Sequence, residues 1–239
     1  MENNHVEGRR AVAEALRSGR PTDRLYVQSG AKGLGELIRA AKENGAVVVE
    51  RDRHFLDRLS QTGTHQGVIA TMAAFAYSEM EDVLARAAGG DLFLIVCDGV
   101  QDERNLGAVI RTAEVVGAHG VVIPKRRSAG LSAVTARAAA GAAEHIPIVR
   151  VPGVPSFLRE LKASGVWIYG AAGDAAENAF DAEFTFPAAL VLGSEETGLH
   201  RLTRELCDKL TALPMSGKTG SLNVSCAAAV LMYRMKYGR

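Results

Sequence analysis

The fold of this chain is best indicated by the stretch Leu213-Pro214-Met215-Ser216-Gly217-Lys218-Thr219-Gly220-Ser221-Leu222-Asn223-Val224-Ser225. An apolar, strand-like run leads into it, and an almost wholly apolar helix, Cys226 to Met235, follows it. The Gly, Ser and Asn residues in between leave backbone N–H and C=O groups free to hold a ligand. Open α/β sheets bind ligands in loops that join a buried strand to a buried helix, so the stretch predicts such a site.

Two further loops of the same kind come earlier in the chain. Asp98–Gly107 follows an apolar run over 92–97, and Leu192–Leu199 follows one over 188–192. Three polar loops at the ends of apolar strands, all in one half of the chain, predict one composite site.

Residues 91–239 alternate regularly between apolar strands and helices. The expected strands are 92–97, 120–124, 146–151, 166–169, 188–192 and 210–213. The expected helices are 106–116, 134–142, 155–164, 202–207 and the C-terminal helix. This alternation predicts an α/β domain with a mostly parallel sheet that helices cover on both faces.

Residues 1–73 are expected to form a smaller α/β domain, followed over 74–90 by a linker with one short helix. The expected helices run from 8 to about 19 and over 34–44, and the expected strands cover 24–27, 46–49 and 67–72. Arginine is frequent in the first helix and turn, at Arg9, Arg10, Arg17, Arg20 and Arg24. These side chains form either a solvated helix surface or a contact to an RNA backbone.

The composition is that of a globular protein, with 47% hydrophobic and 23% charged residues. Lys and Arg number 28 against 27 Asp and Glu, a formal charge of +1, so any nucleic-acid contact must be made by local patches. Cys97, Cys207 and Cys226 have no C-x-x-C spacing and are expected to be buried apolar residues in a reducing compartment.

Several other classes of protein are disfavoured. The polar start predicts no signal peptide, and no run approaches the ~18 apolar residues of a membrane span, so we expect a cytoplasmic protein. No His, Cys or carboxylate cluster has the spacing of a metal site. Gly217-Lys218-Thr219 resembles the end of a P-loop, but the motif requires glycine where this chain has Ala212. No strand leads into a G-x-G-x-x-G turn, so a dinucleotide site is not indicated either.

Three segments together resemble the ordered motifs of the SpoU (TrmH) family of RNA ribose 2′-O-methyltransferases, within the SPOUT superfamily. They are Asn105–Ala113, Leu192–Leu199 and Leu213–Ser225. The likeness extends to the front domain, where His65–Ala70 and the helix that opens at Gly8 resemble the two-domain members that methylate 23S rRNA guanosine.

This resemblance implies the fold, the assembly and the cofactor. The fold is an α/β knot, in which the C-terminal segment threads a loop to form a trefoil knot, although nothing in the periodicity indicates one. The assembly is a homodimer that builds each active site from two subunits. The cofactor is S-adenosyl-L-methionine, held mainly by backbone groups at Gly193, Leu213, Met215 and Leu222.

The resemblance also implies that Arg111 is the key catalytic residue, with Asn105, Glu195, Ser221 and Asn223 holding it and the ribose in register. A guanidinium, whose pKa lies above ~12, does not normally deprotonate, so we expect Arg111 to orient the 2′-oxygen or an adjacent phosphate.

Taken singly, each of these residues has a plainer explanation. Arg111 lies off the buried stripe of its helix, where it could equally form a surface ion pair. Asn105, near the helix start, could be a cap. Glu195 could be a helix-start residue that the dipole favours, and Ser221 and Asn223 could cap the last helix.

Two positions depart from the family pattern, since Glu103 stands where relatives usually carry proline and Glu196 where they often carry glycine. The sequence thus predicts a methyltransferase that acts on the ribose 2′-OH of a guanosine in 23S rRNA, with a front domain that recognises RNA. tRNA is the alternative substrate, and a non-catalytic RNA-binding protein is the alternative function.

Overall fold

A computed structural model describes residues 5–19, 21–60, 62–73, 76–88, 90–218 and 220–238. Arg20, Thr219 and part of the expected linker (74, 75 and 89) lie outside the described residues. The chain divides into two compact units, Met1–Ala76 with Gly130–Ala133, and Tyr77–Ala129 with Val134–Arg239. Each unit is described by itself.

The first unit is built on a four-stranded mixed sheet in the order β1-β4-β2-β3. Its strands are β1 (His5–Glu7), β2 (Thr22–Gln28), β3 (Val47–Arg51) and β4 (Val68–Met72). Its helices are α1 (Arg9–Arg17), α2 (Gly35–Glu43) and α3 (Arg53–Leu59). β4 runs antiparallel to β1 and β2, whereas β2 and β3 are parallel.

The core of the first unit lies between the sheet and the two longer helices. Val12 of α1 and Ala41 of α2 are fully buried in one cluster with Leu25 and Val68 of the sheet. The two helices and three strands expected from the sequence are present. β1 and α3 were not expected, because three and seven residues are too few to show a clear period.

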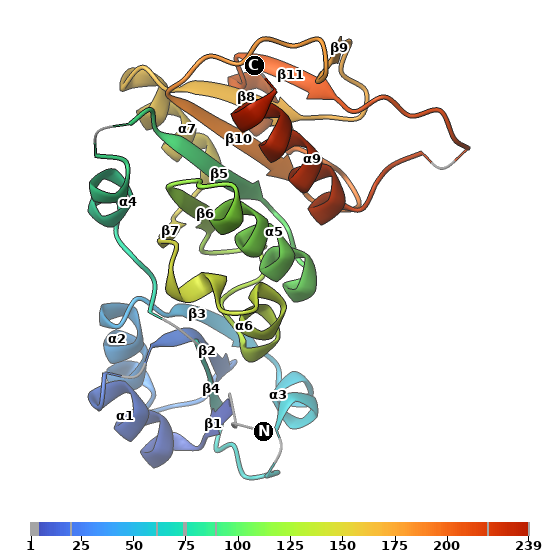
Figure 1. The fold of residues 1–239 in the computed structure, drawn as a ribbon. Helices are drawn as coiled ribbons and strands as arrows, with labels where there is room; N and C mark the ends of the chain where they lie inside the picture. The colour runs from blue at the N-terminus through green and yellow to red at the C-terminus, as the bar shows by residue number, and fades with distance from the viewer. Residues whose placement is uncertain are drawn as a thin grey trace. The chain divides into compact units, whose positions relative to one another are not determined.

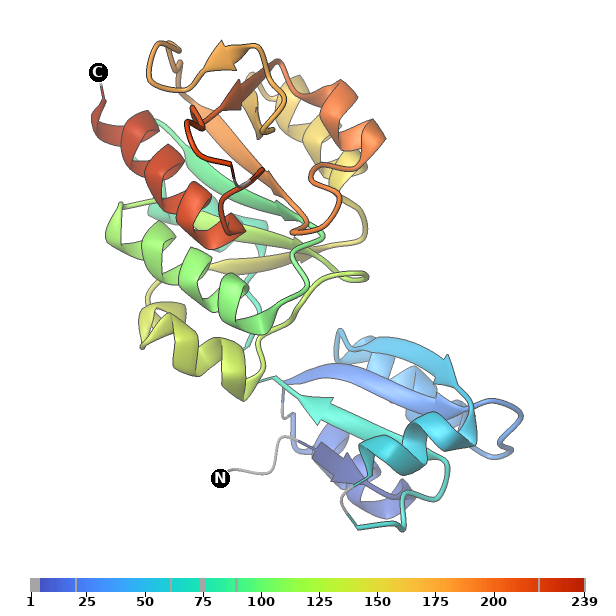
Figure 2. The same cartoon turned by 90° about the vertical axis from the view of Figure 1, so that its right-hand side faces the viewer.

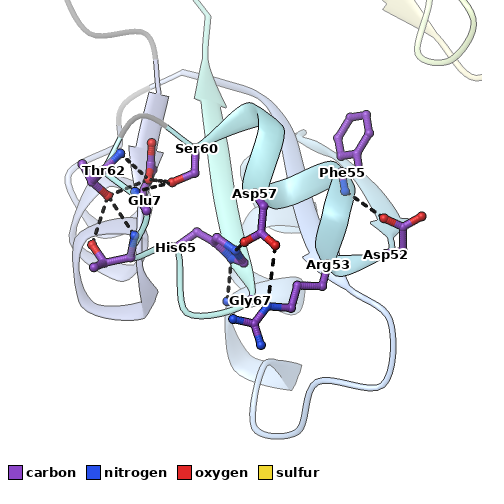
Figure 3. Close-up of polar contacts among 11 residues, drawn as sticks. Glu7, Asp52, Arg53, Phe55, Asp57, Ser60, Thr62, His65 and Gly67 are labelled. Atoms are coloured by element: carbon purple, nitrogen blue, oxygen red, sulfur yellow. Dashed lines mark hydrogen bonds and ion pairs between the residues drawn. The ribbon is translucent and has the colours of Figure 1, made fainter.

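A hydrogen-bonded turn joins α3 to β4 in this unit (Figure 3). The buried His65 ring accepts the N–H of Gly67 at Nδ1, 3.0 Å away, so Nε2 carries the proton that is donated to Asp57 at 3.0 Å. The Gly67 φ of 79° is one that glycine adopts without strain. The turn is therefore held by a side chain and not by backbone contacts alone.

The second unit contains a seven-stranded sheet in the order β7-β6-β5-β10-β8-β11-β9, and every neighbouring pair is parallel. The strands are β5 (Phe93–Asp98), β6 (Gly120–Pro124), β7 (Ile148–Val151), β8 (Trp167–Ala171), β9 (Glu177–Asn178), β10 (Ala188–Gly193) and β11 (Lys209–Ala212). The six expected strands are confirmed within two residues at their ends, and the two-residue β9 is additional.

Helices cover both faces of this sheet, as expected (Figures 1 and 2). They are α4 (Met80–Arg86), α5 (Glu103–Val115), α6 (Ala133–Ala139), a 3-10 turn (Ala142–Glu144), α7 (Val154–Ala163), α8 (Arg201–Leu206) and α9 (Val224–Tyr237). Figure 2 shows α5 and α9 side by side over one face, with α7 and α8 over the other. All residues of β5 and β10 are buried, because these central strands are covered on both sides.

The structure decides which of the possible caps are used at two helix starts. α5 begins at Glu103, and its cap is Asp102, whose carboxylate accepts the N–H groups of Arg104 and Asn105 at 2.7 and 3.1 Å. Asn105 therefore lies inside the first turn and does not cap it. α9 is capped by Asn223 and not by Ser221.

The C-terminal helix is also less buried than its composition predicts. Within one chain, Val230, Tyr233 and Tyr237 of α9 expose 39%, 46% and 62% of their surface. Their spacing places them on one side of the helix, so α9 carries an apolar stripe in addition to the face that it buries. The trefoil knot stays a prediction.

Candidate active site

The three polar loops meet at one edge of the second sheet. β5 lies next to β10, and β8 lies between β10 and β11. All four strands are parallel, so their carboxyl ends lie at the same edge. The register places Gly193, at the end of β10, directly beside Asp98, at the end of β5. The three loops therefore meet at one edge, as expected of loops that follow nearby parallel strands.

A cavity of about 410 Å³ opens between the second and third loops and is called here the β10–β11 cavity. Its size falls within the roughly 300–1,000 Å³ typical of small-molecule sites. All four residues expected to bind the cofactor line it, and so do three of the five expected catalytic residues: Gly193, Leu213, Met215 and Leu222, with Glu195, Ser221 and Asn223. The sequence analysis missed the loop after β8, Ala171–Gly173, which also lines the cavity.

Two features suit the cavity to a polar organic ligand. A Cβ at Gly193 would collide with the backbone of Gly198 and Leu199, so only glycine lets the second loop fold back at this point. Thr211 also lines the cavity, is 1% exposed, and its Oγ1 has no hydrogen-bond partner in the described part of the chain. A buried hydroxyl without a partner is costly, so a ligand that bonds to it would be stabilised.

A short hydrogen-bond chain connects the three loops beside the cavity. Asn105 donates from Nδ2 to Glu195 Oε1 at 2.9 Å, and Asn223 donates from Nδ2 to Asn105 Oδ1 at 3.0 Å. Asn223 in turn accepts the N–H of Ser225 at 2.9 Å, at the start of α9. Each amide thus has a fixed orientation, because its oxygen and nitrogen have different partners.

The Glu195 carboxylate is held at the centre of this arrangement. Besides Asn105, it faces the backbone N–H groups of Gln101 and Asp102, both at 3.4 Å. Ser221 lines the cavity, but its hydroxyl has no hydrogen bond within the described residues. Asn105, Glu195 and Asn223 are therefore brought together, and Ser221 lies beside them.

Arg111 is not brought into this group. It is exposed on α5, lines neither of the two cavities described here, and has no hydrogen bond or ion pair among the residues that the structure describes. It lies six positions after Asn105, which places the two side chains about 120° apart around the helix. One chain alone does not place Arg111 beside Glu195.

A second hollow, of about 450 Å³, adjoins the β10–β11 cavity and is called the β5–β10 hollow. The two share Ser194, Glu195 and Glu196. The rest of the lining comes from the first loop, from Thr197 of the second loop, from Arg127 after β6 and from His200 before α8. Sequence reasoning missed His200, because a single histidine at a helix start carries no motif.

Several of the arginines in the first unit form hydrogen bonds or ion pairs within that unit. Arg9 donates to the backbone oxygens of Gln66 and Lys32 at 3.3 and 2.9 Å. Arg17 pairs with Glu14 at 2.7 Å. Arg10 is exposed, and Arg20 lies outside the described residues. Arg24 pairs with Asp23 at 3.5 Å. These contacts favour the structural explanation for three of the five side chains that were considered for RNA binding.

Two other kinds of feature are absent from the part of the chain that is described. No three His, Cys, Asp or Glu side chains there are grouped as metal ligands would be. No helix among the same residues has the length and apolar character needed to cross a membrane.

Comparison with known proteins identifies the family. Residues 91–233 match the SpoU rRNA Methylase family, and residues 5–78 match the RNA 2'-O ribose methyltransferase substrate binding family. The chain is 42% identical to YacO of Bacillus subtilis, assigned by name to the TrmH family of tRNA/rRNA methyltransferases, over 98% of this chain and 96% of that protein. It is 39% identical to the 23S rRNA (guanosine-2'-O-)-methyltransferase RlmB of Ralstonia nicotianae, over 95% and 92%.

A solved structure is similar along nearly the whole chain. It is the SpoU methyltransferase AviRb of Streptomyces viridochromogenes in complex with the cofactor AdoMet, with a TM-score of 0.59, 26% identity, and coverage of 97% of this chain and 88% of that one. The chain therefore belongs to the SpoU rRNA methylase family and is an S-adenosylmethionine-dependent RNA 2′-O-methyltransferase.

Proposed function

We propose that this enzyme methylates the ribose 2′-OH of a guanosine in 23S rRNA. The observation that carries the proposal is the end-to-end similarity to the Ralstonia enzyme, whose name states that substrate. In the same proposal, residues 1–73 bind RNA, 74–90 link the two domains and 91–239 transfer the methyl group. Such a substrate places the enzyme in the cytoplasm.

The β10–β11 cavity is the proposed cofactor site. S-adenosylmethionine, when bound, supplies a methyl group on a positively charged sulfur. Gly193, Leu213, Met215 and Leu222 would hold it through backbone groups and apolar contact, because all four line the cavity. The orphaned Thr211 hydroxyl adds a hydrogen-bonding group that the sequence analysis did not include.

Glu195, Asn105 and Asn223 are proposed to position the acceptor ribose. Ionised carboxylates only accept hydrogen bonds, so Glu195 can bind a ribose hydroxyl as the donor. Its three N–H neighbours fix the carboxylate before RNA binds, which reduces the ordering needed during the reaction. Ser221, with an uncommitted hydroxyl at the cavity wall, is a further contact for the ribose.

Arg111 is proposed to reach the site of a partner subunit in a homodimer. Two observations support this arrangement: Arg111 is exposed and does not line its own chain's cavity, and α9 carries the exposed stripe of Val230, Tyr233 and Tyr237. A second copy that covered the stripe would bury apolar surface, the dominant favourable term in association. Arg111 would then orient the 2′-oxygen or the neighbouring phosphate.

Methyl transfer to purified RNA tests the proposal. The protein, S-adenosylmethionine labelled in its methyl group, and unmethylated 23S rRNA or tRNA are incubated, and the modified nucleotide is mapped. The matched control is Glu195→Gln, which keeps the shape of the side chain but not its charge. We expect one 2′-O-methylguanosine in 23S rRNA. Methylation of tRNA alone would contradict the substrate, and a protein that binds RNA without methylating it would be the non-catalytic alternative.

A further inference from the structure

The β5–β10 hollow lies directly beside the proposed cofactor cavity, and no role has been assigned to it. The two share the wall formed by Ser194, Glu195 and Glu196. An acceptor nucleotide must bind next to the cofactor, so a hollow on the other side of Glu195 is in the right place for one. The question is whether its side chains suit a nucleotide.

His200 is held in this hollow by a buried carboxylate. Asp98, at the end of β5, is 5% exposed, and its Oδ2 accepts the backbone N–H of His200 at 2.9 Å and the ring Nδ1–H at 3.0 Å. The ring is 46% exposed, and with Nδ1 bound to the carboxylate its Nε2 is left for another partner. The protein thus presents one defined nitrogen of the ring.

Gly99 makes this arrangement possible. Its φ is 92°, and a Cβ there would lie 2.9 Å from Cε1 of His200. Glycine is therefore required both for the backbone conformation and for the close approach of the ring. The backbone after β5 leaves room for the imidazole of His200. This indicates that the position of the ring is a specific feature of the fold and not an incidental surface contact.

Arg127 supplies a cation to the same hollow. It is exposed, has a φ of 57° that is unusual for a residue with a side chain, and forms no hydrogen bond or ion pair with the residues described. Strained backbone in a loop that carries an unpaired charge is a common feature of ligand sites.

Charge is unevenly distributed around the hollow. The carboxylates of Glu195 and Glu196 lie in the wall shared with the cofactor cavity, whereas Arg127 and His200 line only the hollow. Asp102 also lines only the hollow, where its carboxylate accepts the two N–H groups at the start of α5. A nucleotide has the complementary pattern, since its ribose hydroxyls donate hydrogen bonds and its phosphate is anionic. A protonated His200, balanced by Asp98, can donate from Nε2 to a phosphate oxygen beside Arg127.

We propose that the β5–β10 hollow binds the acceptor nucleotide, with its ribose toward Glu195 and a flanking phosphate between Arg127 and His200. Asp98 is the positioning residue for His200. The inference rests on the proposed function only in requiring an RNA acceptor, whether that RNA is 23S rRNA or tRNA.

The test compares variants on RNAs that differ by a single charge. His200→Gln and Arg127→Gln are assayed on a short RNA that the wild type methylates, and on the same RNA with an uncharged methylphosphonate on either side of the acceptor nucleotide. The control is Arg201→Gln, which removes a charge from the next residue. Arg201 lies outside both cavities and pairs on the surface with Glu205.

We expect each of the two variants to raise KM for the normal RNA by about 10- to 100-fold, as for loss of a charged hydrogen bond, with S-adenosylmethionine affinity unchanged. The methylphosphonate should weaken binding to the wild type and to the control, and weaken the two variants little further. Asp98→Asn should raise KM in the same way, because Asp98 orients the ring.

Three results would overturn the proposal. The first is an unchanged KM for both variants, and the second is a methylphosphonate penalty that is the same in the variants and the wild type. The third is a fall of kcat at constant KM in His200→Gln, which would mean that the ring accepts the proton of the 2′-OH. If the wild type methylates tRNA and not rRNA, the proposed substrate is wrong. The same comparison on a tRNA fragment then still decides whether the hollow binds the acceptor nucleotide.

Discussion

The side-chain amide of Asn105 donates to the carboxylate of Glu195 at 2.9 Å, although 90 residues separate them in the chain. The same Asn105 accepts from Asn223, 118 residues further along. Three loops are therefore coupled through one amide, and the cap of α9 is part of the same chain of hydrogen bonds. A change at any of the three is expected to reach the other two.

Two substitutions of Asn223 should distinguish its role in stability from its role in catalysis. In Asn223→Asp the cap of α9 is kept, but the new carboxylate cannot donate to Asn105, which then no longer orients Glu195. We expect unchanged thermal stability and a fall in single-turnover methyl transfer of about 10- to 100-fold, typical of lost positioning. Asn223→Ala should lower both, because a lost cap costs about 1 kcal/mol. Equal rates for wild type and Asn223→Asp would show that the contact is not needed.

Arg111→Ala should slow methyl transfer on the order of a hundredfold or more while S-adenosylmethionine affinity, measured by calorimetry, stays the same. Arg111→Lys should restore the rate only in part, because an ammonium lacks the planar fork of a guanidinium. Mixing Arg111→Ala with Glu195→Gln should recover activity if the site is built from two subunits. Failure of mixed dimers to recover any activity would place Arg111 within its own chain's site.

Gly193→Ala should abolish cofactor binding, because the new methyl group would collide with the backbone of Gly198 and Leu199 and displace the second loop. Gly217→Ala is the matched control, since a Cβ at that position meets no atom of the described residues within 4 Å. The measurement is S-adenosylmethionine affinity by calorimetry. Normal affinity of Gly193→Ala would mean that the loop can refold without loss of the site.

The three cysteines should differ in reactivity. Burial raises the pKa of the Cys97 and Cys207 thiols to about 12, so hardly any thiolate forms near pH 7 and a thiol reagent should not label them in the folded protein. Cys226 is exposed and lies on the same side of α9 as Val230 and Tyr233. It should be labelled at dilutions where the chain is a monomer and protected in the proposed homodimer. Peptide mass spectrometry over a concentration series measures this, and rapid labelling of Cys97 would contradict the burial.

Acid should weaken the turn between α3 and β4 (Figure 3). The hydrogen bond from His65 lowers the pKa of Asp57 below its usual value. A carboxyl whose folded pKa is lowered adds stability above its unfolded pKa, near 4, and the stability is lost as the pH falls through the folded value.

Hydrogen exchange of the Gly67 amide, which donates to His65, reports this turn directly. After correction for intrinsic rates, its protection should fall in acid in the wild type, and above the folded pKa of Asp57 it should be lower in Asp57→Asn than in the wild type. Glu50→Gln, an exposed substitution on β3, should behave like the wild type. A pH-independent protection in the wild type would show that the pair does not stabilise the turn.

Local sequence determined the elements and the family of this protein. The apolar strands over 91–239 and the helices between them could be predicted from local signals. These are the periodicity of the apolar residues and the Gly and Ser residues between the elements. The three polar loops could be predicted as one site, because parallel strands carry their ligand loops on one edge.

Only the tertiary structure decided how the loops meet. The position of β8 between β10 and β11 brings Ala171–Gly173 to the cavity, and small apolar residues give no sign of that in sequence. Asp102, not Asn105, caps α5, which leaves the Asn105 amide for Glu195. The pairing of His200 with Asp98 spans 102 residues and depends on the strand order. Sequence patterns report neighbours along the chain, whereas these contacts follow from the order in which the strands assemble.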